Sequence, residues 1–227
     1  GTVGVTGQLT ARRSTCPGDV VLMTEGAGGG TIATAAIYSG FPDIVEKTIN
    51  LHFLLAADAL LASPAIRAVH SLTDVTNGGL RGDAHEMART AGCRIVIDPE
   101  KVRGLVQRDV GRMLEELEID FLGVSIDALL LTLPAGGVRE VTEVIRSAGV
   151  RIEQVGRVES GPPEAVLEVR GEEQDFSPRF RESAYTPVKK VADRRPEDPE
   201  AMRRAVETAA RDALAKKERV IRRLRKA

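Results

Sequence analysis

The stretch SLTDVTNGGLRGDAHEMARTAG, residues 71–92, places a short apolar segment, an acidic glycine-rich turn and a helical pattern in direct succession. Leu80, Ala84, Met87 and Ala91 recur at intervals of four, three and four residues, which predicts a helix over about 80–90 with one buried face. The residues just before the turn predict a short strand over 66–72. A strand, a tight turn and a helix in this order are typical of α/β folds.

The turn itself permits two interpretations, which the residue types leave open. Thr76 or Asn77 can cap the helix, and Gly78 and Gly79 suit unusual backbone angles, so the turn can be purely structural. Alternatively, backbone amides and the Asp74 carboxylate face a ligand. Because like charges repel, Asp74 would then hold a Mg²⁺ that bridges to phosphate, or accept a substrate hydroxyl or amine.

A second glycine loop lies upstream in LMTEGAGGGTIATAA, residues 22–36, again between a strand and a helix. Its candidate ligand-binding residues are Gly26, Gly28, Gly29, Gly30 and Thr31. They can form a flexible turn against a closely packed helix, or expose helix N-terminal amides to an anion. No Lys follows the glycines, so the loop is not a Walker A motif, and its spacing is not the dinucleotide-binding fingerprint.

Strand and helix patterns interleave up to about residue 176, which predicts an α/β or mixed-sheet α+β domain. The helices beyond those named above are expected over 42–63, 102–119 and 136–149. The strands are expected over 3–10, 19–24, 93–98 and 126–134, followed by two strands, 151–160 and 164–171, joined by an SGPP turn.

The composition bounds the class of protein. The chain has 227 residues, of which 42% are hydrophobic, enough to bury a substantial core. No apolar run approaches the roughly 18 residues that a membrane span needs, and no signal peptide is recognisable. Cys16 and Cys93 match no disulfide or zinc framework. These features predict a cytoplasmic protein without a membrane partner.

The C-terminal part, from about residue 177, differs from the rest in composition, with several prolines and many charged residues. We expect a first domain over 1–176, a charged, proline-containing linker over 177–198 and a basic amphipathic helix over 199–227. Residues 189–227 contain 14 Lys or Arg against 7 Asp or Glu. The helix can pack along the domain, pair with a partner helix, or bind RNA or an acidic partner. No aromatic residue interleaves the basic residues, which argues against nucleic acid.

Five segments together resemble one family. In order along the chain they are PGDVVLMTEGAGGGTIATAA, TDVTNGGLRGDAHEMARTAG, RIVIDPEKV, LGVSIDALLLTLP and QVGRVES. They resemble the C-terminal domain of the aminoimidazole ribonucleotide (AIR) synthase superfamily, over about residues 3–170. Its members include selenophosphate synthetase, the hydrogenase maturation protein HypE, thiamine monophosphate kinase and formylglycinamidine ribonucleotide synthetase.

The resemblance implies a mixed β-sheet covered by helices, to which this chain adds a charged C-terminal helix. It also implies an ATP-dependent, homodimeric enzyme that activates a small substrate by phosphoryl transfer. ATP and Mg²⁺ would bind mainly to an N-terminal domain that is not among these 227 residues, so no catalytic residue and no metal ligand is assigned in this chain. The alternative is a non-catalytic dimerisation or ligand-sensing scaffold that kept the fold.

By the resemblance, the two glycine loops form facing walls of one substrate- or phosphate-binding site. Asp74, Thr76, Asn77, Gly78 and Gly79 would form one wall, and Gly26 to Gly30 the other. One departure is that Ile126 and Asp127 stand where many members carry a glycine. The central expectation is that both loops meet at a common rim and receive a negatively charged ligand.

Overall fold

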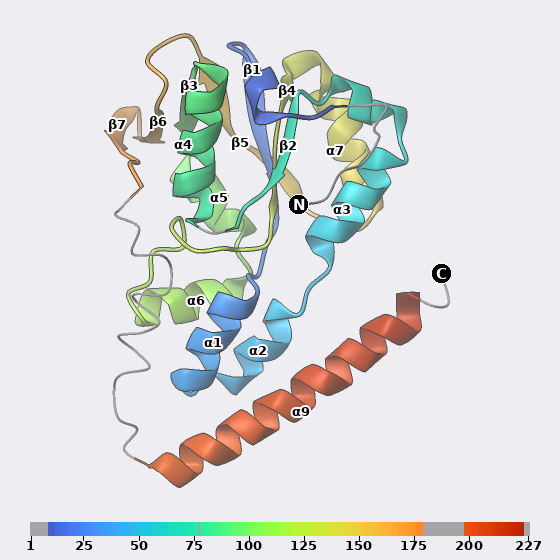
Figure 1. Ribbon diagram of the computed structural model, residues 1–227, viewed down its shortest axis with the longest axis vertical. Helices are drawn as coiled ribbons and strands as arrows, with labels where there is room; N and C mark the ends of the chain where they lie inside the picture. Colours follow the sequence, from blue (N-terminus) through green and yellow to red (C-terminus); the bar gives the residue numbers. More distant parts are fainter. Residues whose placement is uncertain (1–8, 77, 179–197, 225–227) are drawn as a thin grey trace.

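The computed structural model describes residues 9–76, 78–178 and 198–224, and its centre is a seven-stranded mixed sheet (Figure 1). The strand order is β2-β4-β1-β5-β3-β6-β7. β1, β2, β3 and β6 run in one direction, and the other three strands run against them. The strands are β1 (Asp19–Thr24), β2 (Ser71–Asp74), β3 (Arg94–Ile97), β4 (Leu129–Pro134), β5 (Ile152–Glu159), β6 (Ala165–Val169) and β7 (Glu172–Asp175).

The central strand β1 is buried along its whole length. Val21 and Met23 join the core on one face of the sheet, whereas Val20 and Leu22 join a second core on the other face. Successive side chains of a strand point to opposite faces, so an almost uninterrupted apolar run is what a doubly covered strand requires. The predicted strand over 19–24 is confirmed to the residue.

Helices cover both faces of this sheet. α4 and α5 lie on the face of the larger core, and α3 and α7 lie on the opposite face (Figure 1). α1, α2 and α6 gather beyond the end of β1 (Figure 1). The helices are α1 (Gly30–Tyr38), α2 (Pro42–Thr48), α3 (His52–Leu61), α4 (Gly79–Ala91), α5 (Pro99–Leu105), α6 (Arg108–Glu116), α7 (Val138–Ser147) and α9 (Pro199–Leu224).

Two long helices predicted from the sequence are each divided in the structure. The segment 42–63 forms α2 and α3, interrupted at Asn50, whose amide side chain donates to the Gly28 carbonyl at 3.4 Å. The segment 102–119 forms α5 and α6, interrupted at Val106, which forms an isolated parallel bridge with Gly26. Both interruptions serve tertiary contacts with the first glycine loop.

The strand predictions also need correction at several points. Residues 151–160 and 164–171 do form strands, but β5 and β6 do not pair with each other, because β3 lies between them. The predicted strand over 66–72 begins too early: its first three residues belong to a 3₁₀ helix, Pro64–Ala68, and β2 starts only at Ser71. β7 was not predicted. The expected strand over 3–10 falls mostly outside the described residues, and Leu9 and Thr10 are not in a strand.

The final helix packs against α1 and α2 rather than standing free (Figure 1). Ala209 is 1% exposed and belongs to the larger core. The Arg219 guanidinium pairs with the Glu46 carboxylate at 2.8 Å, and the Lys216 ammonium donates to the Glu46 carbonyl. No helix in the described ranges is long and apolar enough to cross a membrane.

Candidate functional site

Both glycine loops follow the carboxyl end of a strand, β1 or β2, and they lie at the same end of the sheet. β1 and β2 run parallel on either side of β4, so that Met23 pairs with Leu130 and Asp74 with Leu129. The start of β4 therefore lies between the ends of the other two strands. Two interstrand steps place the loops roughly 10 Å apart. This edge corresponds to the place where ligands commonly bind in open α/β sheets.

Within the first loop, Gly26 and Gly28 are buried and their amides are engaged. Gly26 donates to the Leu105 carbonyl at 3.1 Å, and Gly28 donates to the Ile126 carbonyl at 2.9 Å. A Cβ added to Gly26 would lie 2.1 Å from the Ile126 oxygen, and one added to Gly28 would lie 2.3 Å from Ile32 Cδ1. These two glycines therefore allow close packing and leave no amide for a ligand.

The next three residues have a different environment. Gly29 and Thr31 are half-buried and Gly30 is exposed, at the start of the nine-residue helix α1. Among the described residues, none accepts a hydrogen bond from the amides of Gly29, Gly30 or Thr31. A Cβ on Gly30 would meet nothing within 4 Å. The open donors of this loop, together with the positive end of the helix dipole, lie at these three residues.

In the second loop too, one glycine packs closely against its neighbours and another has open space beside it. Gly79 is buried with φ +61, and a Cβ there would lie 2.5 Å from the Leu122 carbonyl oxygen. Its amide donates to the Thr76 carbonyl at 2.9 Å. Gly78 is half-buried with φ +96 and has no neighbour closer than 3.6 Å to an added Cβ. Asn77 lies outside the described residues.

A buried carboxylate supports this turn from within. Asp83 Oδ2 accepts from the Thr76 amide at 3.2 Å, and Asp83 Oδ1 accepts from the Arg12 guanidinium at 2.7 Å. The same guanidinium nitrogen donates to Thr73 Oγ1 at 3.0 Å. Burial raises the pKa of Asp83 to about 6, although the nearby Arg12 charge acts in the opposite direction. Asp83 and Arg12 therefore hold the turn that follows β2, and neither was identified from the sequence.

The segment before β4 connects the two loops. Ser125 Oγ approaches the Val75 carbonyl at 3.1 Å and Asp127 Oδ1 at 2.9 Å, while the Ile126 carbonyl holds the first loop. Asp127 has φ +49, which is unusual for a residue other than glycine. Its carboxylate lies against Gly29, and the exposed Asp74 lies at the end of β2. Both loops thus share one rim, with a carboxylate at each side.

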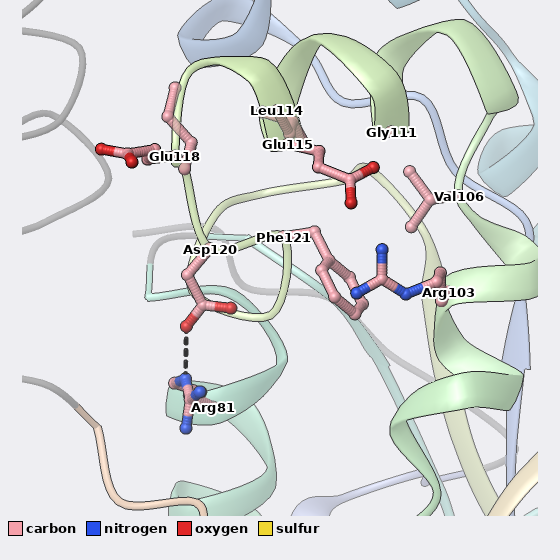
Figure 2. A pocket seen from close by; sticks show the side chains of 10 residues that line it. Arg81, Arg103, Val106, Gly111, Leu114, Glu115, Glu118, Asp120 and Phe121 are labelled. Carbon is pink, nitrogen blue, oxygen red and sulfur yellow. Dashed lines mark hydrogen bonds and ion pairs between the residues drawn. The ribbon is translucent and has the colours of Figure 1, made fainter.

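A pocket of about 310 Å³ lies beside Val106, the residue that bridges to Gly26 of the first loop (Figure 2). Its charged lining residues are Arg81, Arg103, Glu115, Glu118 and Asp120. Arg81 Nε pairs with Asp120 Oδ2 at 2.6 Å, and the Arg103 guanidinium stacks on the Phe121 ring at 4.8 Å. With three carboxylates against two cations, both of which have partners, this pocket is poorly suited to a phosphate. The open amides of the first loop offer the better anion site.

Comparisons with known proteins agree with this architecture. The chain is 45% identical over 227 residues to the uncharacterized protein MJ1416 of Methanocaldococcus jannaschii. The matched region covers 97% of this chain and 48% of that protein. It is 29% identical over 178 residues to selenide, water dikinase of Myxococcus xanthus, covering 65% of this chain and 50% of that protein. The chain therefore spans about half the length of these curated relatives.

The solved structure of hydrogenase maturation protein HypE in complex with ATP shares the fold. The two superpose with a TM-score of 0.57 at 18% identity, covering 75% of this chain and 53% of that one. The family model described as "AIR synthase related protein, C-terminal domain" matches residues 16–168, which include both glycine loops and the segment between them. The chain therefore belongs to the AIR synthase related protein family and carries the C-terminal domain of that family.

Proposed function

We propose that this chain is the phosphate- or substrate-facing part of an ATP-dependent enzyme that activates a small substrate by phosphoryl transfer. The observation that carries the proposal is the pair of glycine loops at one sheet edge, with three open amides at the start of α1. Support also comes from relatives: selenide, water dikinase is a phosphoryl-transfer enzyme by name, and one HypE structure contains ATP.

The residues of the rim fit a nucleotide phosphate accompanied by Mg²⁺. The amides of Gly29, Gly30 and Thr31 can donate to phosphate oxygens, since helix N-termini favour anions. Asp127 and Asp74 supply carboxylate oxygens, the ligands that Mg²⁺ prefers. Without a cation these carboxylates would repel a phosphate, so the rim suits a magnesium–phosphate complex better than free phosphate.

Each part of the rim then has a distinct role. ATP supplies the phosphoryl group, and Mg²⁺ neutralises its charge. The amides of Gly29 to Thr31 orient the phosphate, and the Asp74 and Asp127 carboxylates hold the metal or a substrate hydroxyl. Thr76 and Gly78 form the opposite wall. Gly26, Gly28 and Gly79 contribute by close packing, which keeps the two walls at their present separation.

The direct test is an NMR titration of the chain with Mg–ATP and with Mg–pyrophosphate. The proposal predicts that the backbone amide signals of Gly29, Gly30 and Thr31 shift first and saturate together. A titration in which these amides do not move while the protein is folded would refute phosphate binding at this rim. That result would favour the alternative of a non-catalytic dimerisation or ligand-sensing scaffold.

The remaining parts of the proposal concern assembly and location. A homodimer in the cytoplasm is proposed from the family resemblance, with a small-molecule or phosphate ligand and no nucleic acid. Sedimentation equilibrium of the purified chain tests the first point, since a monomer at all concentrations would contradict a dimer formed by this part alone.

A further inference from the structure

A second cluster of reactive side chains lies at the opposite end of the sheet from the glycine loops. Cys16 precedes β1, Asp19 opens β1 and His70 precedes β2. His70 Nδ1 lies 2.9 Å from Asp19 Oδ2 and 3.5 Å from Cys16 Sγ, and Cys16 Sγ lies 3.7 Å from Asp19 Oδ1. Asp19 and Thr24 are the two ends of one strand, so about 16 Å separates this cluster from the first glycine loop.

The backbone holds the three residues in place. A turn with Gly18 at φ +96 folds the chain so that the Cys16 amide donates to Asp19 Oδ2 at 3.0 Å. The His70 amide donates to the carbonyl of Thr132 in the neighbouring strand β4 at 2.9 Å. The turn Cys16–Asp19 and the segment around His70 are therefore fixed against each other before any ligand binds.

The burial of the cluster is uneven. The Asp19 side chain is only 2% exposed, whereas His70 is one-third exposed and Cys16 is exposed. No Lys or Arg nitrogen of the described residues lies within 4.0 Å of the Asp19 carboxylate. Buried carboxylates are usually paired with a cation or coordinate a metal, and among the described residues His70 is the side chain that lies against Asp19 Oδ2. The cluster thus combines a buried negative charge with two ligand atoms that solvent can reach.

The orientation of the histidine argues against a nucleophilic cysteine. In a Cys–His–Asp relay, the carboxylate and the thiol contact different ring nitrogens, so that a proton can pass across the imidazole. Here Nδ1 faces both Asp19 and Cys16. A single nitrogen that lies close to both a carboxylate oxygen and a sulfur is instead expected when all three atoms are ligands of one metal ion.

The distances agree with such a centre. Zn²⁺ lies about 2.3 Å from a thiolate sulfur and about 2.0–2.1 Å from an imidazole nitrogen, which places sulfur and nitrogen roughly 3.5 Å apart in a tetrahedral site. The observed separation of Cys16 Sγ and His70 Nδ1 is 3.5 Å. All three ligand atoms lie within 4.8 Å of one another.

We propose that Cys16, Asp19 and His70 bind a divalent transition metal of the zinc class, with the fourth position open to solvent. A mixed thiolate, imidazole and carboxylate set favours Zn²⁺ or Co²⁺ over Mg²⁺ or Ca²⁺. On binding, Cys16 releases its thiol proton and His70 carries its proton on Nε2, so that Nδ1 can coordinate. The bound cation would also pair with the buried Asp19 carboxylate, which no Lys or Arg nitrogen of the described residues contacts.

Cobalt provides a selective probe, because thiolate ligation gives an intense charge-transfer absorption in the near ultraviolet. The chain has two cysteines, so the band must come from Cys16 or Cys93. We expect metal-free protein to develop the band and saturate at one Co²⁺ per chain. Cys16→Ser should abolish the band, and Cys93→Ala, which alters a buried core residue, should retain it. His70→Asn should weaken cobalt binding about tenfold or more.

Thermal unfolding provides the second measurement and checks that each variant is folded. Added Zn²⁺ should raise the melting temperature of the wild type and of Cys93→Ala but not that of Cys16→Ser. The absence of a charge-transfer band in the folded wild type would overturn the proposal. A band that persists in Cys16→Ser, or that disappears in folded Cys93→Ala, would also overturn it, because the ligand set would then be different.

Discussion

The Asp127 carboxylate lies against the backbone of Gly29, so closely that a Cβ built on Gly29 would fall 2.4 Å from Asp127 Oδ2. This contact brings a negative charge from the start of β4 beside the open amides of the first loop. Attraction from the amides and repulsion from the carboxylate therefore act on the same ligand. The balance between them depends on whether a cation accompanies the phosphate.

Asp127→Asn should consequently change phosphate binding in opposite directions with and without Mg²⁺. Removing the charge should strengthen the binding of metal-free pyrophosphate by about 1 kcal/mol, or roughly fivefold, and should weaken the enhancement that Mg²⁺ provides. Calorimetric titrations with and without Mg²⁺ measure both effects. Asp58→Asn, which neutralises an exposed carboxylate on α3, serves as the control. Equal effects of the two variants would remove Asp127 from the site.

Gly79→Ala should destabilise the fold. The position has φ +61, and an added Cβ would lie 2.5 Å from the Leu122 oxygen, where backbone would have to move. We expect a loss of at least about 2 kcal/mol in the free energy of unfolding, measured by urea denaturation. Gly104→Ala is the matched control, since it lies in α5 with open space around it. That variant should gain up to about 1 kcal/mol. Similar stabilities for both variants would contradict the packing role given to Gly79.

The buried Asp83 predicts a pH dependence of stability. Its folded-state pKa is about 6, above the ordinary value of 3.8, so between these two pH values the folded protein holds a proton that the unfolded chain releases. The group therefore stabilises the fold most at low pH, and this contribution is lost as the pH rises through about 6. Relative to Asp83→Asn, the wild type should lose unfolding free energy between pH 4 and pH 6. A difference that is constant or increases over this range would show that the pKa is not raised.

The sequence predicted the framework of the fold from local patterns. The central strand β1 and helix α4 follow directly from apolar runs and from helical spacing. The division between α5 and α6 could not be read in this way. Val106 leaves the helix because it bridges to Gly26, about 80 residues away in the chain. The position of β3 between β5 and β6 is likewise a tertiary outcome, and β7 consists of four exposed polar residues without any apolar alternation.

The candidate site was predictable only in part, for a related reason. A glycine-rich loop in the sequence indicates unusual backbone angles. It does not show which glycines pack closely against neighbouring residues and which expose an amide. Gly28 and Gly30 look alike in the sequence, and only the structure separates the buried one from the open one. Ser125 and Asp127 lie in one of the family-like segments, but nothing in the sequence shows that they contact the two glycine loops. The contact of His70 with Asp19 spans 51 positions and leaves no local signal.

The central claim is that open main-chain amides at the start of α1 bind phosphate, and one pair of variants tests it most directly. Gly30→Pro removes a single amide at the first helical position, where proline is well tolerated. Gly30→Ala keeps the amide and places its Cβ in open space. Calorimetric titration with Mg–pyrophosphate should show affinity about tenfold or more lower for the proline variant and unchanged affinity for the alanine variant. Equal affinities for folded Gly30→Pro and the wild type would contradict the claim.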